Sequence, residues 1–521
     1  MKLRIWLQGA GVAILVLFPF CRGPLNRAGF LRMHTPGSAT SLALSLVANL
    51  VLVSLVWMVV GMWLRGTSRW AWLRLLVPGL VLASVAETVY IARMGWESTR
   101  LWLVVLVIII ALTLLLRWRW RQGEQALVQL SSAVLVGLGF YCIFVVVQLL
   151  HFAMWRQLPN FTSETIPATA NRADRPRIVW IVFDELSYRQ VFEDRYAGLE
   201  LPNFDDFRKS STLFTDVQPL VNSTDDAVPS MLVGQRVERV EYTSDNHLKI
   251  LAANGLMHQF DAALTPFALA RQHGLTTGVV GWYNPYCSVL ARYLNQCYWT
   301  DEYLEQPVPG QGKFWPNFLH PWILYGAIFA HPTLILSRSY REHVVTSLIV
   351  PESLEKLSNP AYRTRIFHDL LRRAVPLAES SGPDFVFLHL PIPHPPGFYN
   401  RKTQQFGISS HGSYIDNLAL TDKTLGQLLA ILRQSPRWKN TSVVVCGDHS
   451  WRVYMWSGFS YWTPEDEAAS HGGVFDPRPL LMVHLAGQTT PAMVSGSFPL
   501  LKVHDILDDL VTGKQPVFPS H

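Results

Sequence analysis

Long apolar stretches occupy the first third of the chain and alternate there with short polar segments. Most of them approach or exceed the ~20 residues that an α-helix needs to cross a bilayer. The first stretch is short and follows two basic residues, as in a signal peptide, but it lacks a small-residue cleavage site and further spans follow it. We therefore expect a transmembrane domain of five helices over residues 1–156. The stretches cover residues 5–20, 42–64, 73–92, 101–116 and 126–155.

Basic residues between the spans indicate the orientation of this domain, because Lys and Arg are enriched in cytoplasmic loops. The segment before the first span is basic, and so are the loops between spans two and three and between spans four and five. If these segments lie in the cytoplasm, the C-terminal part of the chain is extracytoplasmic, and this is the orientation we expect. The arginines between spans one and two favour the opposite orientation: Arg22, Arg27 and Arg32.

The hydrophobic pattern changes after the last span. Residues 157–176 are polar, rich in Ser, Thr, Asn and Pro, and without periodicity, so we expect a linker. From residue 177 to residue 521, short β-branched or aromatic runs alternate with helical patterns such as Thr421–Leu432. Continuous apolar strands between helices are typical of an α/β domain with a mainly parallel, buried sheet. The strand-like runs are Ile178–Phe183, Thr277–Gly281, Phe385–Leu390, Ser442–Cys446 and Leu480–Leu485.

One later apolar stretch, Phe318–Leu336, is also long enough to cross a membrane. It contains Pro321 and Pro332, which a spanning helix tolerates poorly. A single crossing there would also separate later site residues from earlier ones. We therefore expect an amphipathic element in the outer leaflet near the active site. A buried core helix and loop is an equally good interpretation.

Composition and charge agree with a membrane protein. Hydrophobic residues make up 49% of the chain, and charged residues make up 16%, against about 25% in soluble proteins. The net charge of +6 is explained by the basic loops between spans, so we expect no nucleic-acid partner. Cys287 and Cys297 lie ten residues apart in one aromatic loop, where a disulfide is plausible and a metal pair less so.

Residue types that bind metals follow or lie in three of the predicted strands. Ligands bind at the carboxyl ends of strands in open α/β sheets, so we expect these side chains to meet at one edge. Mixed carboxylate and imidazole ligands suit Zn²⁺ or Mn²⁺ better than Ca²⁺ or Mg²⁺. Each residue alone could be a capping Asp or a loop His, but the set indicates a metal site. Its members are Asp184 and Glu185, His389 and His394, Asp448 and His449, with His471 as a fourth segment.

These segments resemble the alkaline phosphatase/sulfatase superfamily. The run from Ile181 to Glu185, Leu-Pro-Asn-Phe-Asp-Asp-Phe at 201–207, and Phe214-Thr215-Asp216 are similar to its opening. Asn222 to Leu232 resembles the nucleophile segment of the membrane branch that includes lipid A phosphoethanolamine transferases and lipoteichoic acid synthases. In that branch the nucleophilic Thr precedes a Pro by five residues, as Thr224 precedes Pro229. The segment with His389 and His394 resembles the later "H…S-H-G-P" signature of the superfamily. The segment at Asp448 resembles its metal-binding "D-H", and the segment at His471 resembles its final His.

The resemblance implies a set of roles. Thr224 would be the nucleophile and, with Asp184, Asp448 and His449, would hold the principal metal, Zn²⁺ or Mn²⁺. The remaining residues would bind the transferred group or a second metal: His394, His471 and His389, with Glu185 as a weaker metal ligand. A bound dication would stabilise the threonine alkoxide, whose pKa is otherwise too high for attack on a phosphodiester. A plain N-cap is the alternative role for Thr224.

The implied function is two-step transfer of a phosphoethanolamine or phosphoglycerol group from a membrane phospholipid to an exported glycan or lipid. It would occur on the outer, periplasmic side of the bacterial cytoplasmic (inner) membrane. The Cys or Ser followed by Pro and Arg that marks the sulfatase nucleophile is absent around Thr224, which argues against sulfate-ester hydrolysis. A phosphodiesterase or phosphatase of the same fold, and a non-catalytic membrane scaffold, are the alternatives.

Overall fold

The computed structural model divides into two compact units, each described separately below. The first contains Met1–Asn26, Thr35–Gln157 and Val308–Pro332, and the second contains Arg27–His34, Leu158–Pro307 and Thr333–His521. The structure describes residues 2–25, 36–65, 121–155, 174–242, 248–300, 314–315, 317–319, 321–322, 360–379, 381–407, 412–459 and 461–518.

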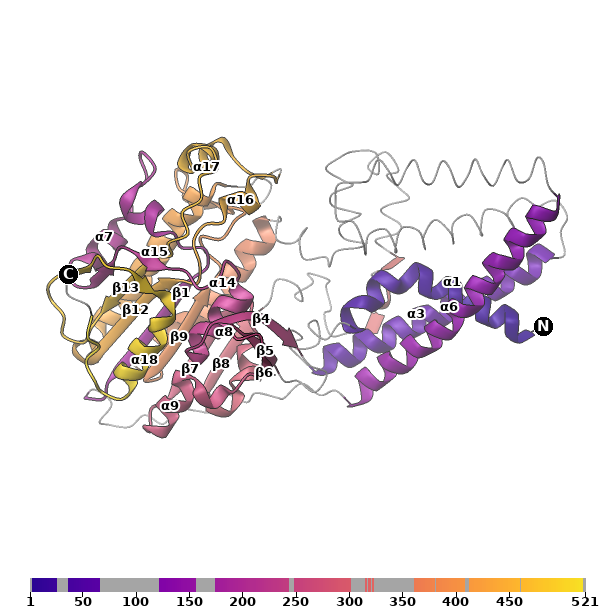
Figure 1. Ribbon diagram of the computed structural model, residues 1–521, viewed down its shortest axis with the longest axis horizontal. Coiled ribbons are helices and arrows are strands. Elements are labelled where there is room, and N and C mark those ends of the chain that lie inside the picture. The colour runs from indigo at the N-terminus through magenta and orange to yellow at the C-terminus, as the bar shows by residue number, and fades with distance from the viewer. Residues whose placement is uncertain are drawn as a thin grey trace. The chain divides into compact units, whose positions relative to one another are not determined.

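The described part of the first unit contains three long helices: α1 (Lys2–Leu25), α3 (Pro36–Arg65) and α6 (Arg121–Trp155) (Figure 1). Within them, Thr40–Val60 and Ser132–His151 are long and apolar enough to cross a membrane, and Leu3–Leu17 is a shorter apolar helix. The predicted spans at 73–92 and 101–116 lie outside the described residues. Two of the five predicted spans, at 42–64 and 126–155, thus coincide with described helices that are long and apolar enough to cross a membrane.

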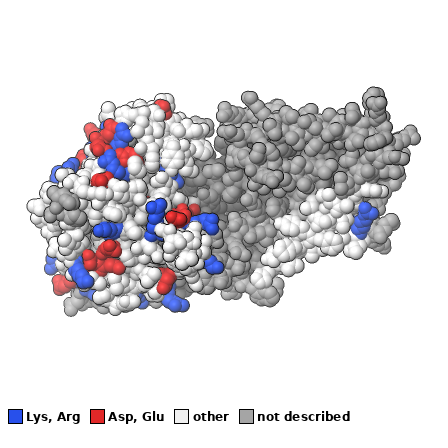
Figure 2. Space-filling view, viewed as in Figure 1, with Lys and Arg blue, Asp and Glu red and all other residues white. Residues whose placement is uncertain are grey.

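The surface of these helices is apolar. Val56, Phe140 and Val147 are each more than half exposed, and the described part of this unit carries few charges on the face shown in Figure 2. Glycine allows the backbones of α1 and α6 to approach closely: a Cβ atom at Gly11 would lie 2.1 Å from the carbonyl oxygen of Leu135. Close backbone contact through small residues is typical of helices packed in a membrane.

The start of the predicted element at Phe318–Leu336 belongs to this helical unit. Asn49 lies in the middle of α3 and is fully buried. Its side chain donates a hydrogen bond to the carbonyl oxygen of Phe318 at 3.0 Å and accepts one from Nε1 of Trp322 at 2.6 Å. The rest of the predicted element lies outside the described residues.

An eight-stranded sheet forms the centre of the second unit (Figure 1). The strands β12, β1, β9, β7 and β8 pair in parallel, whereas β13 runs antiparallel to both of its neighbours. The predicted α/β fold with a mainly parallel sheet is confirmed. In spatial order the strands are β14 (Ala492–Val494), β2 (Thr212–Phe214), β13 (Leu481–His484), β12 (Thr441–Gly447), β1 (Arg177–Phe183), β9 (Phe385–Leu390), β7 (Thr277–Trp282) and β8 (Gln296–Thr300).

Helices cover both faces of this sheet because each central strand is apolar on both sides. In β1, Val179, Ile181 and Phe183 belong to one hydrophobic core, and Ile178, Trp180 and Val182 belong to the other. The first core also contains residues of α7 (Pro202–Arg208), α14 (Pro360–Ala378), α15 (Tyr414–Gln434), α16 (Val453–Trp456) and α17 (Pro464–Ala469). The second contains residues of α8 (Thr224–Val233), α9 (Pro266–Gln272), α10 (Tyr286–Val289) and α18 (Val503–Val511).

Smaller elements complete the unit. A three-stranded sheet is formed by β4 (Val237–Tyr242), β5 (Leu248–Ala252) and β6 (Met257–Gln259). Two strand pairs are formed by β3 (Val217–Gln218) with β15 (Phe498–Pro499) and by β10 (Tyr399–Asn400) with β11 (Gln405–Phe406).

Candidate metal and nucleophile site

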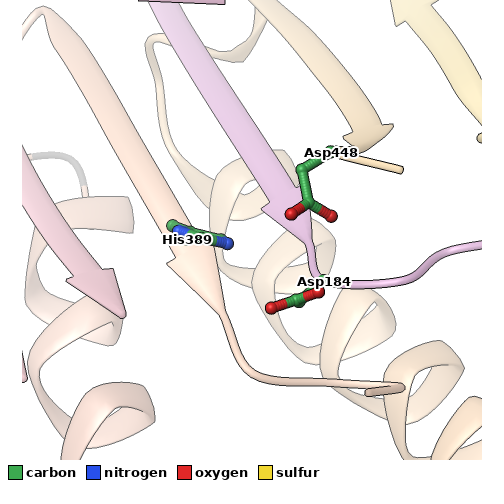
Figure 3. Close-up of side chains that lie close together, drawn as sticks. All are labelled: Asp184, His389 and Asp448. Carbon is green, nitrogen blue, oxygen red and sulfur yellow. The ribbon is translucent and has the colours of Figure 1, made fainter. Parts of the chain in front are cut away.

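The parallel register of three strands brings the predicted metal-binding residues together. In this register Phe183 of β1 lies opposite Gly447 of β12, so Asp184 and Asp448 leave the sheet side by side. His389 of β9 pairs with Val182, one position earlier on β1. Asp184, His389 and Asp448 therefore point into the same space at the carboxyl edge of the sheet (Figure 3).

The chemistry of this group fits a divalent cation. One ligand atom from each of Asp184, His389 and Asp448 lies within 4.8 Å of the others, and all three residues are buried. His389 Nε2 and Asp448 Oδ2 are buried without a hydrogen-bond partner among the described residues. Unpaired buried polar atoms are costly, and a bound cation would satisfy them. In the structure His389 lies with the two carboxylates, where the sequence suggests only a role with substrate or a second metal.

His449 also faces this group. Its Nε2 atom lies 3.4 Å from Asp448 Oδ2 and 3.6 Å from Asp184 Oδ1. Its Nδ1 atom lies 3.0 Å from the carbonyl oxygen of Ser450, which can only accept a hydrogen bond. Nδ1 therefore carries the proton, and the Nε2 lone pair is directed at the carboxylates, as metal-bound histidines require.

Burial keeps both imidazoles neutral. Burial lowers the pKa of His449 to about 3 and the pKa of His389 to about 4, because a low-dielectric environment disfavours the imidazolium form. The Nδ1 atom of His389 lies 2.7 Å from the hydroxyl group of Tyr286. Both rings can thus offer a lone pair to a cation at neutral pH.

Thr224 lies next to the same acids. It is the first residue of α8, and the residue in the N-cap position is Ser223, so Thr224 is not the plain N-cap considered above. Its hydroxyl group donates a hydrogen bond to Asp184 Oδ2 at 3.4 Å and lies 3.3 Å from His449 Nε2. A cation held by these two residues would lie close to the Thr224 oxygen.

A loop after β7 supports the start of α8. Asn284 donates a side-chain hydrogen bond to the carbonyl oxygen of Thr224 at 3.4 Å, and Tyr283 donates its hydroxyl hydrogen to Asp225 at 3.2 Å. Tyr283 thus holds the side chain of Asp225 beside the nucleophile. Cys287 and Cys297 form a disulfide that joins the helix after this loop to β8.

Glu185 is held by other side chains. It is fully buried and accepts hydrogen bonds from Arg452 Nε at 2.6 Å and from Trp456 Nε1 at 2.9 Å. Its left-handed backbone conformation, with φ of 63°, lets the chain turn directly after Asp184. Arg452 was not among the predicted site residues. The feature of the sequence that points to Arg452 is its position four residues after Asp448, on the segment that also carries His449.

His394 lies at the border of the site, where Trp282 and Trp456 approach its ring edge-to-face. Its Nε2 atom lies 3.9 Å from Glu185 Oε1, and Asp184, Glu185 and His394 form a second group whose spacing could hold a cation. Arg363 holds the loop in place by donating to the carbonyl oxygens of Pro391, His394 and Pro395. Burial, and then the positive charges of Arg363 and Arg452, lower the pKa of His394 well below its usual value.

The structure does not bring His471 to this group. Its side chain is 54% exposed, and its Nε2 atom bonds to Asp194 Oδ2 at 2.6 Å. Asp194 in turn accepts from Arg189. Among the described residues this network involves none of the buried acids of the site, and the predicted role of His471 with substrate or a second metal stays a prediction.

This part of the chain is similar to known proteins. The sulfatase family model matches residues 176–498, which contain every residue of the site. A search of curated protein sequences finds no match to the chain.

Several solved structures are similar in fold. They include the phosphonate monoester hydrolase of Agrobacterium radiobacter, with 14% identity over 66% of this chain and 78% of that chain and a TM-score of 0.37. The PsFucS1 sulfatase from Pseudoalteromonas sp. has 13% identity over 65% and 68% of the two chains and a TM-score of 0.41. The lipoteichoic acid synthase LtaP from Listeria monocytogenes has 13% identity over 66% and 74% and a TM-score of 0.37.

Proposed function

Because the chain belongs to the sulfatase family, we propose that it is a metal-dependent enzyme in which Thr224 transfers a phosphoryl headgroup from a membrane phospholipid to an exported acceptor. The observation that carries this proposal is the position of the Thr224 hydroxyl. Its oxygen lies 3.4 Å from Oδ2 of Asp184, in the candidate metal group, and 3.3 Å from the Nε2 atom of His449.

The residues suit a two-step reaction. In the first step Thr224 Oγ1 forms a bond to phosphorus, and the bond between phosphorus and the diacylglycerol oxygen breaks, so that diacylglycerol leaves with a proton. In the second step a hydroxyl oxygen of the acceptor attacks the phosphothreonine, and Thr224 leaves as the alcohol again. Asp184 can take the proton of the Thr224 hydroxyl, because its Oδ2 atom accepts a hydrogen bond from that hydroxyl group.

Asp184, Asp448, His389 and His449 would hold the metal, and Zn²⁺ or Mn²⁺ suits their mixed oxygen and nitrogen atoms. The bound ion would stabilise the threonine alkoxide and the negative charge that develops on the phosphoryl oxygens. Because all four side chains are buried, water competes little with these charges.

Apolar helices in the same chain support a lipid donor. Two described helices are long and apolar enough to cross a membrane, and holding enzyme and donor in one bilayer raises their effective concentration. We propose phosphatidylethanolamine or phosphatidylglycerol as the donor, and a glycan or lipid hydroxyl as the acceptor. The catalytic unit would then work on the periplasmic side of the bacterial inner membrane.

Mass spectrometry of the peptide that contains Thr224 tests the proposal. Purified protein is incubated with bacterial phospholipids, and a phosphoethanolamine or phosphoglycerol adduct is expected on Thr224 and not in Thr224→Ala. If no adduct forms while the protein holds metal and releases phosphate from soluble esters, the enzyme is a hydrolase. If neither adduct nor metal is found, the chain is a membrane scaffold.

A further inference from the structure

A short segment between β8 and α14 bonds to the middle of α3. Its described residues, 314–315, 317–319 and 321–322, are helical, and we call them the returning segment. Asn49 donates a hydrogen bond to the carbonyl oxygen of Phe318 at 3.0 Å and accepts one from Nε1 of Trp322 at 2.6 Å. Both polar groups of the buried Asn49 side chain are therefore bonded to this segment.

Asn49 lies near the centre of the part of α3 that is long and apolar enough to cross a membrane. That part runs from Thr40 to Val60, so Asn49 is nine residues from one end and eleven from the other. At 1.5 Å per residue it lies about 14 Å from the Thr40 end, near the middle of a hydrocarbon core about 30 Å thick. Backbone polar groups at this depth need a partner within the protein, and Asn49 is that partner for Phe318. The returning segment thus lies at the same depth.

The chain before and after the returning segment lies on one side of the membrane. Asp184 precedes the segment and His389 and Asp448 follow it, yet ligand atoms of these three residues lie within 4.8 Å of one another. A single crossing would place Asp184 on one surface and the other two on the opposite surface. A segment at mid-depth, with both ends on one side, must enter and leave the bilayer through the same surface.

One face of the returning segment is apolar and exposed. Trp315 and Leu319 are four residues apart, a spacing that puts two helical side chains on one face, and they are 66% and 47% exposed. Close to Asn49, α3 also exposes Val51 and Leu55, by 50% and 46%. Exposed apolar side chains of this kind mark a surface that lipid or protein covers. Acyl chains suit this face, because the exposed side chains of α3 at the same depth are also apolar.

We infer that the returning segment is part of a re-entrant element that reaches the middle of the bilayer, with Trp315 and Leu319 against phospholipid acyl chains. This is deeper than an amphipathic element that lies along the outer leaflet. The chain between β8 and α14 is then anchored in the bilayer that would hold the lipid donor. The inference rests on the membrane location in the proposed function, and it does not depend on the reaction at Thr224.

Spin labels on the full chain in phosphatidylcholine bilayers test the depth. A nitroxide is attached at Leu319→Cys, with Val51→Cys as the control for mid-depth and Leu264→Cys as the control for water. Leu264 is 52% exposed in the catalytic unit. Power saturation compares molecular oxygen, which enters hydrocarbon, with a nickel chelate, which stays in water. The oxygen-to-nickel ratio at Leu319 should equal that at Val51 and exceed that at Leu264 by about tenfold or more, because polar solutes are excluded from hydrocarbon. The free cysteines are first replaced by Ala: Cys21, Cys142 and Cys446.

The control at Val51 separates failure of this inference from failure of the membrane location. If the label at Leu319 is as open to nickel as the label at Leu264 while Val51 is protected, the re-entrant element is overturned and α3 remains in the membrane. If Val51 is also open to nickel, α3 does not span the bilayer, and the membrane location fails together with the inference. Dipolar broadening between Leu319 labels that disappears on dilution with unlabelled chain would show that a second copy covers this face, and would overturn the lipid contact.

A photoreactive lipid tests the same contact in the unmodified chain, so the result does not depend on whether the cysteine variants fold. The bilayer contains a phosphatidylcholine with a diazirine in the middle of one acyl chain. After illumination, mass spectrometry should find lipid adducts on the peptide that contains Leu319 and on α3, and none on the peptide that contains Leu264. A second phosphatidylcholine carries the diazirine on its headgroup. Adducts at Leu319 from the headgroup probe alone would place the segment at the membrane surface and overturn the inference.

Discussion

The Nε2 atom of His449 lies 3.3 Å from the hydroxyl oxygen of Thr224, and the other ring nitrogen of His449 faces a carbonyl oxygen. This pairing leaves the lone pair of His449 directed at the nucleophile and at the buried carboxylates. The ring can therefore bind a cation beside Thr224, or accept the hydroxyl proton when no cation is there. The position of one histidine thus links metal binding to activation of the nucleophile.

Removing the Thr224 hydroxyl should abolish the covalent adduct. Thr224→Val keeps the branched shape at the start of α8, so the fold and the bound metal should be retained. Turnover should fall by at least about 1,000-fold, as for the loss of other nucleophiles. Adduct formation and phospholipid turnover are measured side by side.

Ser223→Ala is the matched control for this variant. Ser223 is the neighbouring hydroxyl residue, and its side chain makes no capping hydrogen bond. It should keep both the adduct and the turnover. An adduct in Thr224→Val would place the nucleophile elsewhere in the chain.

Metal affinity should distinguish the residues of the metal group from His471. Asp184→Asn and His389→Gln should each weaken Zn²⁺ binding by more than about 100-fold, since even residues around metal ligands contribute 10- to 100-fold. His471→Ala should bind as the wild type does, because that side chain is exposed and bonds to Asp194. Competition with a chromogenic chelator measures all three. Equal losses in His471→Ala and Asp184→Asn would contradict this assignment.

Much of the catalytic unit could be predicted because the central strands are uniformly apolar. The run predicted at Phe385–Leu390 has the bounds of β9, and Ser442–Cys446 falls within β12 (Thr441–Gly447). Parallel strands that are buried on both faces leave this continuous signal. The direction of β13 could not be predicted, because an antiparallel strand inside the sheet is equally apolar: all four of its residues are buried.

The candidate site was predictable where a residue type itself indicates chemistry. Asp184, Asp448 and His449 directly follow buried strands, so their meeting at one edge follows from the topology. The role of Arg452 could not be predicted, since an Arg in a loop is usually a solvated surface residue. Only the fold shows that Arg452 pairs with the buried Glu185.

Acid should destabilise the metal-free protein. The pKa values of His389, about 4, and His449, about 3, lie below the unfolded value of 6.5. Between these values the unfolded state binds more protons, so the free energy of unfolding falls as the pH drops below 6.5. At pH 5 each histidine should cost about 2 kcal/mol relative to pH 7.

Thermal unfolding with a chelator, at pH 5 and pH 7, measures this loss. His389→Gln cannot take up the proton and should lose less stability between the two pH values than the wild type. His471→Ala should follow the wild type, because His471 is exposed. An unchanged unfolding temperature at pH 5 would show that the two imidazoles are not buried as neutral groups.

Asn49 should tie residues 317–322 to α3. Its amide is buried in an apolar helix and is satisfied by Phe318 and Trp322, so Asn49→Ala leaves their polar groups without this partner. Hydrogen bonds between membrane helices contribute about 1 kcal/mol. Hydrogen exchange should therefore speed up at residues 317–322. Ser54→Ala is the control, because the Ser54 hydroxyl group donates to Leu50 of its own helix, and exchange at 317–322 should not change.

The disulfide between Cys287 and Cys297 should stabilise the catalytic unit and hold the loop that supports Thr224. Closing a ten-residue separation contributes about 2–3 kcal/mol in the chain-entropy model. Replacing both cysteines by Ser should lower the free energy of unfolding by that amount. It should also slow adduct formation, because Tyr283 and Asn284 contact the start of α8 from this loop. Metal affinity should not change, since the metal group is held by β1, β9 and β12. Tyr283→Phe, which removes the hydrogen bond to Asp225, should slow adduct formation without the loss of stability. A double variant as stable as the wild type would show that the sheet alone positions the loop.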